Sequence, residues 1–412
     1  MRTHGDFINM NKLGRFCCIA ALAIGSWAAE AANSDPIVLI HGFIGWGRDE
    51  MFGMKYWGGG FAGERDLQEV LKANGTPTYT VAVGPVSSVW DRAVETYYEV
   101  KGGCVDYGAA HAAKHGHNRY GRCYSALYPQ WDATHQVHFV THSMGGQTAR
   151  ALETLLRDGA QEERAASGDA VAELYKGGKK WTHSITTLST PHDGTTLATG
   201  VQLLGIAPQV VGAAAAVAGL NSSTDVVYDF KLDQWNLRRN SGESFDSYLN
   251  RVTSSPIWNG SIKDISLWDL SPDGAKELNQ WTKTYSDTYY FSFSTEATYR
   301  GLLTGWQYPE LSMFLPFQPL AMFMGTYTRN QAGKVALDSS WWQNDGIVNT
   351  RSMRAPAGHP WVSYNGTPVK GSWNHMGLWN SWDHFDIQGL FCASCNINPL
   401  HIQHANLLKS LD

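Results

Sequence analysis

A buried strand, a tight turn and a helix follow one another directly within residues 136–159, and this succession most constrains the fold. The apolar run QVHFVTHS predicts the strand, and the segment GQTARALETLLRDG predicts the helix. Strands that lead into helices pack as parallel sheets with covered faces, because each element buries its apolar side against the other. Ser143 lies in the turn itself, two positions before Gly145.

Four other short apolar runs have the same character, and helix-like segments lie between several of them. They span residues 36–43, 78–83, 183–194 and 288–296. Neither an internal repeat nor a low-complexity linker separates them. A chain of 412 residues is long enough for one large domain. The sequence therefore predicts an α/β fold with a largely parallel sheet, formed by residues 32–412 as one domain with insertions.

Residues 1–31 predict a cleaved secretion signal. With Met10 as the start, Lys12 and Arg15 precede the apolar run FCCIAALAIGSWAA, and the letters AEA supply a small-x-small cleavage site. The alternative, a membrane anchor, needs a longer apolar stretch. We therefore expect a secreted chain and leave these residues out of the fold.

Four cysteines remain beyond the signal, and export favours their oxidation. Proximity in the sequence pairs Cys104 with Cys123 and Cys392 with Cys395, although four cysteines allow three pairings. The rival is a zinc site built from all four thiolates. The long separation between the two pairs and the oxidising compartment disfavour that site.

Residues 201–220 form an uncharged apolar stretch that meets the length rule for a membrane-spanning helix. The stretch also contains Pro208 and three glycines, and spanning would place Ser143 and the C-terminal part of the chain on opposite sides of a membrane. We interpret residues 196–224 as an apolar lid over a lipid site, with a buried helix as the alternative.

The charge of the chain gives no basis for binding nucleic acid, because the net charge is −5 and no cluster of Lys and Arg occurs. The 17 tryptophans and 18 tyrosines exceed what a core needs, which places some of them at a wet surface or an interface. Neither property predicts the oligomeric state.

Ser143 is either a nucleophile or a helix N-cap. A nucleophile at a strand-to-helix turn usually lies in the pattern Gly-x-Ser-x-Gly, because the backbone packs closely there. Gly145 matches the second glycine of this pattern, whereas Thr141 stands in place of the first. The segment His41-Gly42-Phe43 follows the first strand. Hydrolases with a serine nucleophile at a strand-to-helix turn place there one of the two backbone amides that bind the oxyanion. The second donor would be the backbone N–H of Met144. These features favour a nucleophile.

Chain order predicts that an acid and then a base follow the serine. Asp345 lies in the turn-like Asn-Asp-Gly of WWQNDGIVNT, and His384 lies in WNSWDHFDIQG near the C-terminus. Their spacing favours them over their rivals. The rival acids are Asp193, Asp383 and Asp386, and the rival bases are His375, His401 and His404.

Seven segments of the chain resemble the large secreted lipases typified by thermophilic Bacillus and Geobacillus. They are IVLIHGFIGWGRDEMFGMKYWGG, VDYGAAHAAKHGHNRYGR, HSMGGQTAR, TPHDGTT, VYDFKLDQWNLRR, FSTEATYRGLLTG and NDGIVNT, and the similarity extends over about residues 36–389. The resemblance implies an α/β-hydrolase fold with a helical lid and an inserted zinc subdomain, acting on long-chain triacylglycerols. The family's nucleophile, acid and base fall on Ser143, Asp345 and His384, and its oxyanion amides fall on Phe43 and Met144.

The resemblance also implies a structural zinc ion. Its ligands fall on Asp91, His111 and His117, and the fourth aligns with Asp264 after a gap, with Asp269 as the fallback. Two imidazoles and two carboxylates neutralise Zn²⁺ and complete a tetrahedral shell, which leaves no position for water. The two insertions that carry this subdomain span about residues 85–130 and 225–275.

The calcium site of the family is matched only in part. Asp386 stands where the family has a glutamate, and Ser312 stands where a glycine donates its backbone carbonyl. The family's later Asp-Pro pair is replaced by LFCASCNINP, so we expect a Cys392–Cys395 disulfide to take over part of the restraint of that loop.

Two other functions share these features. A carboxylesterase or polyesterase would use the same triad on shorter or polymeric esters, and a binding module would keep the fold without chemistry. The filled triad positions disfavour the binding module, and the lack of an HExxH motif disfavours a metalloprotease. The sequence therefore favours a secreted triacylglycerol lipase that works at a lipid/water interface.

Overall fold

The computed structural model describes residues 33–59, 66–205, 208–209, 228–392 and 396–412. Three predicted features lie wholly or partly outside these ranges: the signal at residues 1–31, most of the lid at 196–224, and Cys395. Within the described ranges, no helix has the length and apolar character that crossing a membrane requires.

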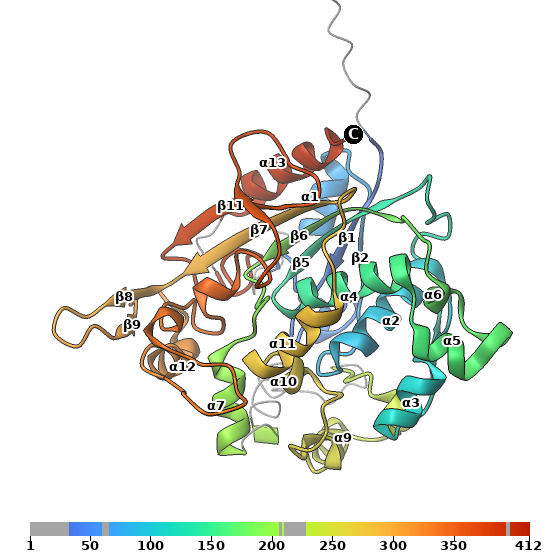
Figure 1. Cartoon of the computed structure of the whole chain (residues 1–412), viewed down its shortest axis with the longest axis horizontal. Coiled ribbons are helices and arrows are strands. Elements are labelled where there is room, and N and C mark those ends of the chain that lie inside the picture. The colour runs from blue at the N-terminus through green and yellow to red at the C-terminus, as the bar shows by residue number, and fades with distance from the viewer. Residues whose placement is uncertain (1–32, 60–65, 206–207, 210–227, 393–395) are drawn as a thin grey trace, which may run out of the picture.

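A seven-stranded sheet forms the centre of the molecule (Figure 1). Its strand order is β10-β11-β7-β6-β5-β1-β2, and every neighbouring pair is parallel. Five of the strands coincide with the five apolar runs of the sequence, so the α/β class with a largely parallel sheet is confirmed. The strands are β1 Ile37–Ile40, β2 Thr78–Thr80, β5 Val137–His142, β6 Thr182–Leu188, β7 Tyr289–Glu296, β10 Trp361–Ser363 and β11 Trp373–Asn380.

The strands β10 and β11 were not anticipated from the sequence. Strand β11 is buried only at its start, and its register against β7 shifts between His375 and Leu378, around Gly377 at φ 121°. Strand β10 is short and half exposed at the sheet edge. Neither has the continuous apolar run that marks a strand buried on both faces.

Helices cover both faces of the sheet, as predicted. Side chains of β1 alternate between two cores, so that Ile37 and Leu39 pack toward α1 and α13, whereas Val38 and Ile40 pack toward α2 and α4. Because both of its faces are buried, β1 carries apolar residues without interruption. The four helices are α1 Leu67–Ala73, α13 Asn398–Lys409, α2 Val89–Lys101 and α4 Met144–Asp158.

Shorter elements surround this centre. Two small antiparallel hairpins lie outside the main sheet, one formed by β3 and β4 and the other by β8 and β9 (Figure 1). The hairpin strands are β3 Gly103–Asp106, β4 Tyr120–Tyr124, β8 Thr298–Arg300 and β9 Gln307–Pro309. The remaining α-helices of the described residues are α3 Ala109–His115, α5 Gln161–Ser167, α6 Glu173–Lys176, α7 Thr196–Leu204, α9 Phe245–Thr253, α10 Ser266–Asp269, α11 Pro272–Trp281 and α12 Gln318–Met324.

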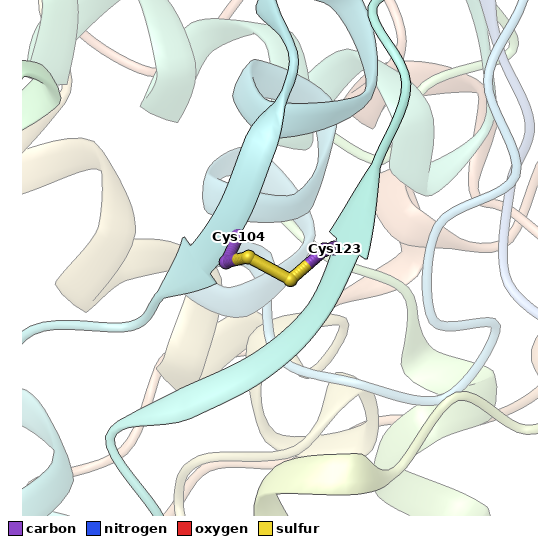
Figure 2. The surroundings of a disulfide bond; sticks show 2 residues. All are labelled: Cys104 and Cys123. Carbon is purple, nitrogen blue, oxygen red and sulfur yellow. A yellow bond between two sulfur atoms is a disulfide. The ribbon is translucent and has the colours of Figure 1, made fainter.

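A disulfide joins Cys104 to Cys123, which face each other across β3 and β4 (Figure 2). This confirms the predicted pair and contradicts a zinc site of four thiolates, because the two sulfur atoms are bonded to each other. Cys392 is also disulfide-bonded. Its predicted partner, Cys395, lies outside the described residues.

Candidate active site and metal cluster

The carboxyl ends of β1 and β5 lie side by side at the centre of the sheet. The chain proceeds from β1 to β2 on one side and from β5 to β6 on the other, and such a change of direction opens a crevice at the carboxyl ends of the strands. A Cβ atom added to Gly42 would lie 2.7 Å from the Ser143 Cβ. The predicted oxyanion segment and the predicted nucleophile therefore meet in this crevice.

Ser143 has a strained backbone, with φ at 54° and ψ at −128°. Its N–H donates to the Leu188 carbonyl at 2.9 Å, and its own carbonyl accepts from the Thr190 hydroxyl at 2.8 Å. A Cβ at Gly145 would lie only 2.3 Å from the Ile40 carbonyl, so the start of α4 packs against β1 only with glycine there. Packing thus holds Ser143 in a conformation that costs about 1–3 kcal/mol, as is common at functional sites.

Thr141, which stands where the nucleophile pattern usually has its first glycine, fits inside the sheet. Its side chain is fully buried, and its hydroxyl donates to the Thr186 carbonyl of β6 at 2.8 Å. Since the hydroxyl has this partner, threonine introduces no unsatisfied buried polar group.

Asp345 and His384 form a buried pair, with 2.8 Å between Asp345 Oδ2 and His384 Nδ1. The Ile347 and Val348 amides donate to Asp345 Oδ1, and the Thr295 hydroxyl donates to Oδ2. These three donors hold the carboxylate in place beside the His384 ring. Because Nδ1 of His384 donates to this carboxylate, its Nε2 carries the lone pair that can accept a proton.

The rival acids and bases point to other partners. Asp193 accepts from Asn279 and the Ala357 amide. Asp383 accepts the amides of Phe314 and Phe385, and Asp386 accepts the Asp383 amide. The rings of His375, His401 and His404 contact Ser292, the Ile387 carbonyl and Thr186. Among these acids, Asp345 alone has a hydrogen bond to the His384 ring within the described part of the chain.

Tyr56 and His142 link the two halves of the site, and sequence reasoning missed both. The Gly42 amide donates to the Tyr56 hydroxyl at 3.1 Å, and that hydroxyl lies 2.5 Å from His142 Nδ1. His142 Nε2 lies 2.8 Å from the His384 carbonyl, which can only accept, so Nε2 donates and Nδ1 accepts from Tyr56. Burial lowers the pKa of His142 well below its usual range, which keeps the bridging ring neutral.

The backbone amides of Phe43 and Met144, the predicted oxyanion donors, have no acceptor among the described residues. Met144 is the first residue of α4, and its amide has no acceptor within the helix. The amides of Gly42, Ile44 and Gly45 have partners, whereas no acceptor for the Phe43 amide occurs among the described residues. This arrangement fits the predicted pair of oxyanion donors.

Arg92 contacts the segment that follows β1, and sequence reasoning did not identify this residue either. Its buried guanidinium donates to the carbonyls of His41 and Gly84 and to the Thr148 hydroxyl. It therefore ties the turn after β1 to α2 and α4. The sequence gives no local signal for this role, because the partners of Arg92 are distant in the chain.

Four predicted metal ligands gather in one buried cluster: Asp91 from α2, His111 from α3, His117, and Asp264 before α10. His111 Nε2 lies 3.3 Å from Asp91 Oδ1 and 3.2 Å from Asp264 Oδ1, and His117 Nε2 lies 3.1 Å from Asp264 Oδ2. Asp91 Oδ1, Asp264 Oδ2 and both Nε2 atoms are nevertheless buried without a hydrogen bond. Buried polar atoms that face one another unbonded fit a shared cation.

The surroundings of the cluster orient its ligands. His117 Nδ1 donates to the Asn118 carbonyl at 2.9 Å, which leaves the lone pair on Nε2, and Gln234 holds the other oxygen of Asp91 at 2.7 Å. Burial opposes a positive charge here, yet Asp264 and Asp91 raise the pKa of His111 to about 10. The carboxylates thus favour positive charge at the centre of the cluster, and the donor set suits Zn²⁺.

Comparison with known proteins identifies the family. Residues 33–399 match the model of the lipase-like family described as "Lipase-like, C-terminal domain". The chain belongs to the lipase-like family. Its seven-stranded parallel sheet with helices on both faces is that of an α/β-hydrolase.

Relatives of this lipase-like chain include a lipase of Staphylococcus epidermidis, 40% identical over 363 residues, which are 87% of this chain and 50% of the relative. Lipase 1 of Staphylococcus aureus is 38% identical over 363 residues, which are 87% of this chain and 51% of that protein. The chain therefore spans about half the length of the curated relatives it matches. The bacterial lipase part of the predicted resemblance is confirmed, whereas the narrower Bacillus and Geobacillus type stays a prediction.

Solved structures of other lipase-like proteins superpose closely on this one. EstA from Clostridium botulinum is 44% identical with a TM-score of 0.86, covering 94% of this chain and 90% of that one. Lipase 1 from Pelosinus fermentans is 47% identical with a TM-score of 0.82, covering 92% and 100%. The Staphylococcus hyicus lipase is 34% identical with a TM-score of 0.77, covering 92% and 97%.

The fourth side chain of the cluster is Asp264 and not the fallback Asp269. Asp269 instead accepts the Val89 amide at 2.6 Å and lies outside the cluster. A cavity of about 620 Å³ borders His111 and Asp264 and gives the cluster a path to solvent.

The residues predicted for calcium are placed differently. Burial, with Asp383 next, raises the pKa of Asp386 to about 7, and one Asp386 oxygen accepts the Asp383 amide at 2.8 Å. Ser312 is exposed. Among the described residues, Asp386 does not belong to a group of three or more His, Cys, Asp or Glu side chains that could hold a metal ion, so the calcium site stays a prediction.

Proposed function

We propose that this chain is a secreted lipase that hydrolyses carboxylic esters of long-chain acylglycerols with Ser143, His384 and Asp345. The observation that carries the proposal is the buried Asp345–His384 pair, fastened through the His384 carbonyl to His142, the neighbour of the strained Ser143. A serine, a histidine with a free Nε2 and an orienting carboxylate are the parts of acyl transfer.

In the proposed reaction, Ser143 Oγ attacks the ester carbonyl while His384 Nε2 takes its proton. Asp345 keeps the imidazole oriented and stabilises its charge. The Phe43 and Met144 amides donate to the oxyanion. His384 then protonates the departing alkoxide, which leaves an acyl-Ser143 ester. Water, deprotonated by His384, cleaves that ester and releases the fatty acid.

We further propose that Asp91, His111, His117 and Asp264 hold a zinc ion, as in the Bacillus and Geobacillus lipases that the sequence resembles. Such an ion neutralises the two carboxylates and joins α2, α3 and the segment before α10. With four protein ligands it has a structural role. Calcium at Asp386 and Ser312 is the weaker part of this resemblance, because the residue types differ.

Replacing the proposed nucleophile tests the reaction directly. Ser143→Ala should lower kcat on a triacylglycerol by about 10⁴-fold or more, because the remaining groups cannot form an acyl-enzyme. Circular dichroism should show an unchanged fold. Activity near that of the parent would exclude the mechanism. Profiling the parent on esters of graded chain length, above and below their solubility limit, separates a lipase from a short-chain or polymer esterase.

A further inference from the structure

The β8–β9 hairpin extends away from the body of the protein, beyond the end of β7 (Figure 1). Strand β7 ends at Glu296 and β8 begins at Thr298, so the hairpin continues a central strand past its carboxyl end. Three antiparallel residue pairs hold its two arms together. The hairpin is therefore an ordered projection at the edge of the sheet where the candidate active site lies.

The tip of this projection is apolar and faces solvent. Leu302 and Leu303 each have a relative exposure of 101%, and Leu311 and Leu315, a few residues further on, reach 96% and 76%. No other large apolar side chains of the described residues are as exposed as these four. Scattered apolar residues on a surface are normal, but four such exposed leucines within residues 302–315 favour an interaction site.

The base of the hairpin is fastened to the segments that carry the proposed acid and base. The Ala297 amide donates to the carbonyl of Asn344, the neighbour of Asp345. The Phe314 amide donates to the carboxylate of Asp383, the neighbour of His384, at 2.8 Å. The exposed leucines thus have a fixed position relative to the candidate active site.

The charge of residues 298–328 favours one class of partner. Residues 298–328 carry only two formal charges, Arg300 and Glu310, which cancel. A nucleic acid or an acidic peptide would need a cationic surface, and this segment offers none. A narrow projection buries its apolar side chains best in a medium that deforms around it. The apolar layer beneath an uncharged lipid surface is such a medium.

We infer that Leu302, Leu303, Leu311 and Leu315 form a docking surface that inserts into an uncharged lipid surface and turns the crevice of Ser143 toward it. This inference rests on the proposed function, since it names the part of the molecule that contacts the aggregated substrate. These four leucines lie outside residues 196–224, the proposed lid, in the sequence.

Partition onto vesicles tests the inference without catalysis. The protein carries Ser143→Ala, and the vesicles consist of ether-linked phosphatidylcholine, which has no ester to cleave. Leu302→Ser with Leu303→Ser should lower the partition coefficient at least tenfold, because each buried leucine contributes about tenfold or more to transfer from water. Val369→Ser is the matched control, because Val369 is a half-exposed apolar residue away from the hairpin. It should change partition less than twofold.

Three results would overturn the inference. The first is that the leucine double variant partitions like its parent at an unchanged melting temperature. The second is that partition appears only with anionic lipid in the vesicles. The third is that the double variant alters the oligomeric state in solution, which would make the hairpin an interface between copies of this chain. Failure of the proposed reaction shows separately, as a lack of ester turnover by the parent protein.

Discussion

The described residues contain two buried clusters of histidine and aspartate, and they differ in how their polar atoms are satisfied. The first, here called the metal cluster, consists of Asp91, His111, His117 and Asp264. The second, here called the amino-end cluster, lies at the start of β5 and β6 and consists of Asp35, His138 and His183.

In the amino-end cluster, most polar atoms have ordinary partners. His138 Nδ1 lies 2.8 Å from the Ser184 hydroxyl and its Nε2 lies 3.0 Å from the Asn33 side-chain oxygen, while His183 Nδ1 lies 2.7 Å from Asp35 Oδ2. Only His183 Nε2 is buried without a partner. In the metal cluster, by contrast, both Nε2 atoms and two facing carboxylate oxygens are unbonded.

The comparison teaches that residue types alone do not identify a metal centre. Both clusters offer imidazole and carboxylate donors within 4.8 Å of one another. The hydrogen bonds of the amino-end cluster already satisfy all of these atoms except His183 Nε2, so a cation there would have to replace them. In the metal cluster, by contrast, a cation would bind buried atoms that have no hydrogen-bond partner.

Disrupting the metal cluster should therefore have the largest effect on stability. Chelation, or His111→Ala, should lower the free energy of unfolding by about 3–5 kcal/mol, because buried carboxylates lose their partner. Calorimetry of metal-depleted and zinc-reloaded protein measures this loss. His135→Ala, which removes an exposed histidine paired with Asp132, is the control and should change little. If chelation abolished the initial rate at low temperature and left the melting temperature unchanged, a catalytic metal would be indicated.

A smaller effect is expected in the amino-end cluster. His183→Asn removes the contact with Asp35 and should lower the free energy of unfolding by about 1–3 kcal/mol. Elemental analysis should find one zinc ion per chain both before and after this change. Two ions in the parent and one in the variant would contradict the distinction drawn between the clusters.

The smallest expected effect is a dependence on pH that arises in the amino-end cluster. Burial, with His183 next, lowers the pKa of His138 well below its usual range, so the folded protein holds this ring neutral. The unfolded chain takes up the proton near pH 6.5, so the stability contributed by the neutral ring is lost as the pH falls below that value. His138→Gln should remove about 1 kcal/mol of the change in unfolding free energy between pH 6.5 and 5.5. Urea titrations at each pH measure this change, and an equal change in parent and variant would show that His138 is not the group responsible.

The parts of the fold and site that were predicted have local signals. Ser143 was found from a strand-turn-helix pattern, and Asp345 and His384 were found from turn residues in the expected chain order. Short apolar runs identified five strands, of which β1, β5 and β6 are buried along their whole length. The metal ligands came from resemblance to a family and not from spacing.

The parts that were missed depend on contacts between distant segments. Tyr56 and Arg92 act through backbone groups that lie far from them in the chain, and no periodicity marks such partners. His138 and His183 look unrelated until the parallel pairing of β5 and β6 brings their rings to 4.6 Å. Strand β11 is too polar and too interrupted for its pattern to predict it.

The hydrogen bond between His142 and the His384 carbonyl has a consequence for the order in which the protein becomes active. It joins residues 242 positions apart, so Ser143 leaves the ribosome long before the histidine that would activate it. Until the C-terminal segment packs against β5, the serine has no base, and Gly42, Tyr56 and His142 lack their final anchor. Under the proposed reaction, Ser143 therefore gains its base only when the segment that carries His384 packs against β5.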